Sequence, residues 1–175
     1  MKKKITFITT AFFLISSAVL AQTNLKEYEA GHIFHISIPE YMGKTIGLNN
    51  AATIQYKSEV KDVYGFVIED NKEELKLAEL NYTSINEFYE GFIKDFLTDE
   101  DDRFVSQPLF KKNGDINFVE SDVTYYDKEA KINIYYLVGI VETKSAYYKV
   151  LSWSAAENKD KFKADFQKIV YSLKD

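Results

Sequence analysis

The sequence predicts an α+β fold with a mainly antiparallel sheet, and three observations lead to this prediction. Short stretches of alternating apolar and polar residues mark strands in the first half of the chain. Three longer apolar stretches, residues 116–126, 131–142 and 146–155, follow one another with only short connections and therefore form an antiparallel meander. Two segments with helical periodicity, Ser84–Leu97 and Asn158–Lys174, can pack on that sheet.

The early strands are identified by their alternation. His32–Pro39 places Phe34, Ile36 and Ile38 on one face, and Pro39 ends the strand because it has no backbone N–H. Residues 51–58 alternate in the same way, which indicates a strand with one solvated face. Val63–Asp70 is apolar on both faces, so we expect it deeper in the sheet.

The helices are identified by their caps and stripes. Ser84 with Glu87 three residues later predicts a capping box. The apolar stripe that follows consists of Ile85, Phe88, Tyr89, Phe92, Ile93, Phe96 and Leu97. Asn158 is the expected cap of the last helix, whose stripe is Phe162, Phe166, Ile169, Val170 and Leu173. A further short helical turn is expected within Lys72–Leu80.

Turn residues predict the registers of the meander. Pro108 breaks or edges a strand over 104–112, and Asn113-Gly114-Asp115 provides a hairpin turn because Asn-Gly tolerates a positive φ. With Asp127–Ala130 as the next connection, we expect Val123 opposite Ile134.

The last hairpin is apolar on both faces. A Lys144-Ser145 turn places Val138 opposite Leu151 and Tyr136 opposite Trp153. Because an exposed antiparallel sheet shows one polar face, this hairpin is expected to be covered on both sides, with its rings mostly in the core.

The rings of this hairpin are also the candidate ligand or partner residues. Tyr147 and Tyr148 lie next to the turn and are expected to reach solvent, and Trp153 follows on the same strand. If they served a ligand, they would line a cleft with few polar groups.

The N-terminus has the layout of a secretory signal peptide over residues 1–21. Basic Lys2–Lys4 precede an apolar run, Ile5–Ser16, and Val19-Leu20-Ala21 predicts cleavage after Ala21. The run is short for a membrane anchor, so we expect export without membrane insertion, to the periplasm or outside the cell. The absence of Cys excludes a lipoprotein and disulfides.

Residues 22–175 are expected to form one domain. Removing three lysines and no acidic residue lowers the net charge from −5 to −8, which disfavours nucleic-acid partners. A chain of this length can bury about two-thirds of its unfolded surface, which is enough for a core without metal or disulfides.

The order of elements resembles the PsbP-like superfamily. The resemblance rests on the early "FHISIP" strand, the "YYLVGIVETKSAYYKVLSWS" hairpin and the closing "FKADFQKIVYSLK" helix. It implies an α/β/α sandwich with a central, mainly antiparallel sheet, and non-enzymatic docking or accessory work in the envelope. Tyr41 departs from the Trp of many relatives, and no family binding residue can be carried over. The Ala-Gln cleavage and the Lys/Asn/Ile-rich composition are typical of a Bacteroidetes secreted protein.

An acidic run follows the first long helix. Asp99, Asp101 and Asp102 could form a weak divalent-cation site, but Arg103 and Phe104 occupy positions where an EF-hand needs a ligand and a glycine. A solvated loop is the favoured interpretation. No other cofactor is expected.

Catalytic motifs are absent from the sequence. There is no Cys nucleophile, no Gly-x-Ser-x-Gly elbow and no phosphate-binding glycine loop. Glu120 and Asp122 are expected on the polar face of one strand, about 7 Å apart by strand geometry. This separation fits a pair of catalytic carboxylates in a glycosidase and equally fits the ordinary solvated face of a strand.

Three hypotheses follow. The first is an exported non-catalytic accessory domain that docks to another envelope or secreted protein. The second is a carrier of a small or lipophilic ligand beside the aromatic hairpin, and the third is a carboxylate-based hydrolase.

Overall fold

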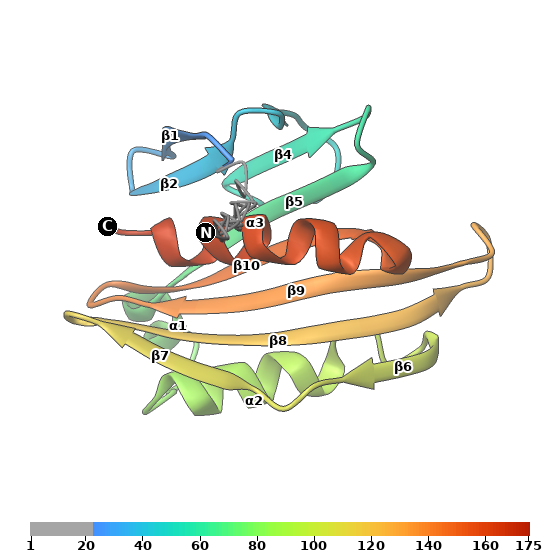
Figure 1. Cartoon of the computed structure of the whole chain (residues 1–175). Helices are drawn as coiled ribbons and strands as arrows, with labels where there is room; N and C mark the ends of the chain where they lie inside the picture. The colour runs from blue at the N-terminus through green and yellow to red at the C-terminus, as the bar shows by residue number, and fades with distance from the viewer. Residues whose placement is uncertain (1–22) are drawn as a thin grey trace, which may run out of the picture.

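The computed structural model describes residues 23–175, so the predicted signal peptide lies outside the described residues. Figure 1 shows the arrangement. The strands are β1 (Leu25–Ala30), β2 (Phe34–Pro39), β3 (Gly43–Lys44), β4 (Ile54–Ser58), β5 (Val63–Asn71), β6 (Asp101–Val105), β7 (Leu109–Asn113), β8 (Ile116–Asp127), β9 (Ile132–Glu142) and β10 (Ala146–Ala155). The helices are α1 (Lys72–Leu77), α2 (Ile85–Asp95) and α3 (Lys159–Ser172), with a 3₁₀ turn at Ala156–Asn158.

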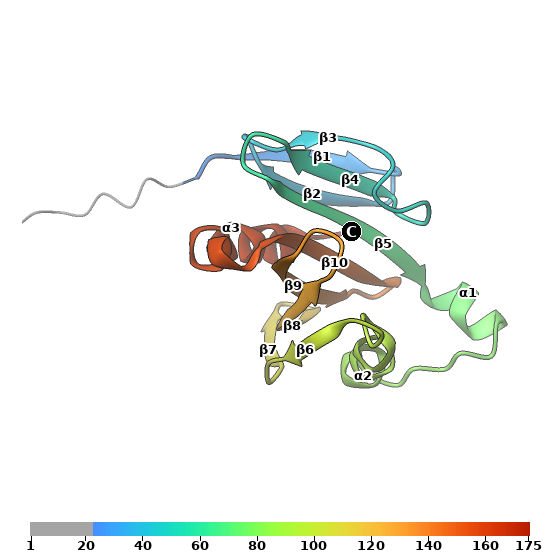
Figure 2. The same ribbon diagram turned by 90° about the vertical axis from the view of Figure 1, so that its right-hand side faces the viewer.

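One large antiparallel sheet dominates the fold. Its strands follow the order β3-β4-β5-β10-β9-β8-β6, and β7 pairs with the other end of β8. Helix α3 and the separate β1–β2 hairpin cover one face, whereas α2 covers the other, as Figure 2 shows. The predicted α+β class with a sheet covered on both sides is therefore confirmed. Within residues 23–175, no helix is long and apolar enough to cross a membrane.

The core under α3 is built from the predicted stripe. Its five stripe residues are all buried: Phe162, Phe166, Ile169, Val170 and Leu173. Gly139 on β9 allows the helix to come close, because a Cβ there would lie 2.5 Å from a Val170 methyl group. We call the side of the sheet that carries α3 the α3 face, and the opposite side the α2 face.

Helix α2 begins as predicted, with one shift in its cap. The Ser84 hydroxyl accepts the N–H of Glu87 at 3.3 Å. The returning bond from the Glu87 carboxylate reaches Thr83, whose N–H donates at 2.7 Å, rather than Ser84. The predicted short helix is present as α1, and the Asn71 side chain caps it. Asn158 occupies the cap position of α3, but its side chain makes no capping hydrogen bond.

The two predicted registers have different outcomes. The β9–β10 register is confirmed, with Val138 opposite Leu151. The predicted β8–β9 register is wrong by two residues, because Val123 lies opposite Tyr136 rather than Ile134. The Asp127 carboxylate accepts two backbone N–H groups in the connection, at 2.8 and 2.9 Å, and this turn extends the loop to Lys131. A shift of two residues leaves every side chain on its expected face.

The edge formed by β6 and β7 agrees with expectation in part. The strand predicted over 104–112 is broken around Pro108, as expected, but its first part begins earlier than predicted, at Asp101. Asp101 and Asp102 therefore belong to a strand rather than to the predicted solvated loop, although both are exposed. Asp102 has a φ of 52° where the pairing with β8 is irregular. Strand β1 was not predicted, because its residues are mostly exposed.

Candidate functional site

A hollow of about 240 Å³ lies where α1 and the loop after it meet the end of the β9–β10 hairpin. Its lining is more polar than apolar and consists of Lys72, Leu75, Lys76, Leu80, Asn81, Tyr82, Thr83, Glu142 and Tyr147. We call this region the α1 corner. Among the residues expected at a binding site, Tyr147 is the one found here.

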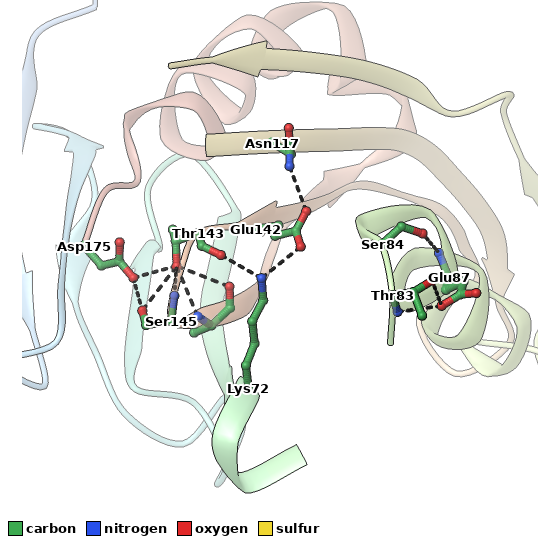
Figure 3. A network of polar contacts seen from close by, with 10 residues as sticks. Lys72, Thr83, Ser84, Glu87, Asn117, Glu142, Thr143, Ser145 and Asp175 are labelled. Carbon is green, nitrogen blue, oxygen red and sulfur yellow. Dashed lines mark hydrogen bonds and ion pairs between the residues drawn. The ribbon is translucent and has the colours of Figure 1, made fainter. Parts of the chain in front are cut away.

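Lys72, the first residue of α1, is the central cation of the corner. Its ammonium donates to Glu142 Oε1 at 2.9 Å and to the Thr143 carbonyl at 2.8 Å, as Figure 3 shows. It also lies 4.6 Å from the centre of the Tyr147 ring. These contacts join α1 to the turn of the hairpin.

Glu142 uses both carboxylate oxygens. Oε2 accepts the side-chain amide of Asn117 on β8 at 2.8 Å (Figure 3). Partial burial alone would raise the pKa of Glu142, but Lys72 and Asn117 hold that pKa below its ordinary value. Burial and the Glu142 charge raise the pKa of Tyr147 to about 12. The hollow is therefore lined by the Lys72–Glu142 ion pair and the neutral phenol of Tyr147. Both carboxylate oxygens of Glu142 already accept hydrogen bonds.

A second polar cluster lies on the other side of the same turn. One carboxylate oxygen of Asp175 accepts hydrogen bonds from the hydroxyls of Thr143, at 2.6 Å, and Ser145, as Figure 3 shows. The same oxygen also accepts the hydroxyl of Tyr148 at 3.2 Å. Burial, followed by the Asp175 charge, raises the pKa of Tyr148. This cluster fastens the segment after α3 to the hairpin.

The sequence predicted that Tyr147 and Tyr148 reach solvent, and this prediction is wrong. Only 3% of Tyr147 and 0% of Tyr148 is exposed. Phe88 of α2 stacks on the Tyr147 ring, with centroids 4.3 Å apart. Phe34 of β2 packs on Tyr148 at 4.9 Å. The two tyrosines point to opposite faces of β10, so each is covered by a different layer.

Trp153 lies apart from this corner. It is six residues beyond Tyr147 on the same strand, about 20 Å away by strand geometry. Tyr64 and Tyr136 flank it on the neighbouring strands and stack on its two sides, at 5.5 and 5.1 Å. Both faces of the indole are thus in use, and the three predicted ring residues do not surround one cleft.

Glu120 and Asp122 are buried beneath α3 rather than on a solvated face. The Glu120 carboxylate accepts bonds from Gln167 at 2.6 Å and Tyr171 at 2.5 Å. Asp122 accepts bonds from Tyr135 at 2.9 Å and from two lysines of α3, Lys159 and Lys163, both at 2.8 Å. Burial acts to raise the pKa of Asp122, but these donors outweigh it and the pKa is lowered.

The acidic run does not form a ligand set. Asp101 pairs with Lys128 at 2.9 Å. Within residues 23–175, no three His, Cys, Asp or Glu side chains come close enough to hold a metal ion together. The structure thus gives the predicted cation site at Asp99, Asp101 and Asp102 no support.

The sequence did not predict the grouping of Lys72, Asn117 and Glu142. The register aligns Tyr147, Glu142 and Asn117 on adjacent strands. The β8–β9 register predicted from the turns would have displaced Asn117 from this row. A correct register was therefore the signal that could have found the site.

Comparisons with solved structures identify a PsbP-like fold. The chain is similar to the cyanobacterial PsbP, CyanoP, of Synechocystis, with a TM-score of 0.59 and 14% identity, covering 92% of this chain and 98% of that one. It is also similar to LpqN of Mycobacterium tuberculosis, with a TM-score of 0.57 and 8% identity, covering 87% of this chain and 90% of that one. No family model and no curated protein matches the sequence.

Proposed function

We propose that this protein is an exported, non-catalytic accessory domain that docks to another envelope or secreted protein. The fold it shares with CyanoP and LpqN supports the proposal, and LpqN is described as involved in cell envelope biogenesis. The signal-peptide pattern of residues 1–21 supports export to the periplasm or beyond. A Bacteroidetes source is part of the same proposal and rests on composition alone.

The observation that carries the proposal is the exposed apolar surface of the α1 corner. None of the residues of α1 is buried. Leu77 is 86% exposed, and Leu80, which borders the hollow, is 49% exposed. An exposed apolar side chain that borders a small pocket, as Leu80 does, is typical of a surface that receives an anchoring side chain from a protein partner. At about 240 Å³ the hollow is smaller than usual small-molecule pockets, which span roughly 300–1,000 Å³.

The structure weakens the two alternatives. A carrier was expected to use a cleft with few polar groups lined by Tyr147, Tyr148 or Trp153, but the hollow beside Tyr147 is more polar than apolar, and Tyr148 lies on the opposite face of β10. A hydrolase was expected to use Glu120 and Asp122, but these carboxylates hold α3 through bonds to its side chains. The position of Tyr147 at the hollow is the one observation that favours a carrier, and the polar lining weighs against it, so we propose neither alternative.

The experiment is affinity capture from envelope extracts with residues 22–175 as bait. The double variant Leu77→Ser with Leu80→Ser should lose the captured partner, because it removes the apolar anchor. Ile33→Ser is the matched control, since Ile33 lies in the β1–β2 turn and is 45% exposed, close to the 49% of Leu80. Equal capture by both variants, or substrate turnover by the pure protein, would contradict the proposal.

A further inference from the structure

Strand β7 is an open edge of the large sheet. It pairs with β8 on one side, and within residues 23–175 no strand pairs with its other side. All five of its residues are exposed, and two are large and apolar: Leu109 and Phe110, at 47% and 46%. Exposed apolar edge strands are a template for pairing with another chain, and proteins usually protect them.

The hairpin geometry identifies which backbone groups are free. Asn113 lies opposite Ile116 across a two-residue turn, and such flanking residues form a hydrogen-bonded pair. Bonded and non-bonded pairs alternate along the ladder, so the N–H and C=O groups of Phe110 and Lys112 point away from β8. Both side chains lie on the α2 face, because their partners Val119 and Asn117 do.

The rest of this edge is protected in ways that β7 is not. The connection contains Pro108, which cannot donate to a new strand, and β6 carries the irregularity at Asp102. Strand β7 has only Lys111 and Lys112 for protection. Lys111 lies 4.1 Å from the Tyr171 ring centre, whereas Lys112 has no carboxylate within 4 Å among the described residues.

The lysines of β7 distinguish between two candidate partners for its free edge, the β7 of a second copy and an acidic strand of another protein. Pairing with the β7 of a second copy would bring the two Lys112 side chains together on the α2 face and the two Lys111 side chains together on the α3 face, and like charges on adjacent strands are destabilising. An acidic strand would instead find an unpaired cation. Lys112 also ends a row across the sheet, Lys112–Asn117–Glu142–Tyr147, that begins at the α1 corner. The two surfaces therefore lie at the same end of the molecule.

We propose that β7 binds an extended acidic segment of the docking partner by strand addition. The segment hydrogen-bonds the free backbone groups of Phe110 and Lys112, and places a carboxylate beside Lys112 and an apolar side chain beside Phe110. This inference rests on the proposed docking function and gives the chemistry of the partner.

The probe is a synthetic peptide of alternating Glu and Val, and a Lys-Val peptide of the same length serves as its control. In NMR hydrogen exchange on residues 22–175, the Glu-Val peptide should protect the amides of Phe110 and Lys112. Lys112→Glu should weaken Glu-Val binding at least tenfold and confer binding of Lys-Val. Protection confined to other amides, or binding unchanged by Lys112→Glu, would overturn the inference.

Backbone pairing is tested by Phe110→Pro against Phe110→Ala. Proline removes the outward N–H at a position that does not bond to β8, whereas alanine keeps that N–H. Proline should abolish Glu-Val binding, and alanine should weaken it by about threefold. Equal loss in both variants would overturn strand addition. If proline unfolds the domain, the exchange and Lys112→Glu results decide alone.

Two further outcomes separate this inference from the docking function. Concentration-dependent dimerisation that Lys112→Glu abolishes would overturn it in favour of a second copy. Capture of the partner that survives Phe110→Ala and Lys112→Glu but fails in the Leu77 and Leu80 variant would keep the docking function and reject β7 as its strand site.

Discussion

Hydrogen-bonded carboxylates occur both beneath α3 and at the α1 corner, but they have different roles in the two regions. Beneath α3, the carboxylates of Glu120 and Asp122 are buried and bonded to side chains of the helix. At the α1 corner, the ion pair of Lys72 and Glu142 is partly exposed, with 31% and 14% of the side chains accessible, and borders a hollow. A carboxylate whose bonds are satisfied inside a layer therefore holds the fold, whereas one at a corner can also shape a surface.

The largest expected effect separates the core from the corner. Phe166→Ala should lower the free energy of unfolding by about 3–5 kcal/mol, because a fully buried ring leaves a cavity under α3. Leu77→Ala should change it by less than about 0.5 kcal/mol, since that side chain is exposed. Urea denaturation of both variants measures the contrast, and similar losses would show that α1 is packed more tightly than described.

The next effect concerns the buried carboxylate. Asp122→Ala should cost about 1–3 kcal/mol, because it leaves the Tyr135 hydroxyl and two lysines without their acceptor. The lysines are about one-third exposed, which keeps the cost below that of a fully buried pair. Asp160→Ala on the exposed side of α3 is the control. An equal change in urea midpoint for the two variants would refute the structural role of Asp122.

A smaller effect is expected at the corner. Lys72→Met should cost about 1 kcal/mol, because the ion pair is partly exposed and solvent replaces some of its contacts. The same variant should leave the core intact. A loss as large as that of Phe166→Ala, measured by thermal unfolding, would mean that α1 belongs to the core.

The smallest effect is on pH dependence. The pKa values of Glu142 and Asp122 are lowered in the folded state. Their stabilising contribution is therefore present above the unfolded pKa values, 4.5 and 3.8, and is lost as the pH falls through the folded values. Glu142→Gln should flatten the fall in stability below about pH 4.5. An unchanged slope in acid titrations followed by circular dichroism would contradict this assignment.

The sequence predicted the layers better than the site. Helical stripes and the two-residue turn at Lys144-Ser145 are local patterns, so α2, α3 and the β9–β10 register could be found. Burial of Tyr147, Tyr148 and Glu120 depends on which segment covers them, and no local pattern contains that information. The grouping of Lys72 with Glu142 joins residues 70 positions apart through α1, and it needed the topology to be known.

The most direct test of the central claim is site-specific photocrosslinking in the envelope. A photoreactive residue at position 80, beside the hollow, should form one discrete adduct with a partner protein. The same residue at position 33, an apolar site in the β1–β2 turn that is 45% exposed against 49% for Leu80, should form none. Equal crosslinking at both positions, or adducts at neither, would contradict docking through the α1 corner.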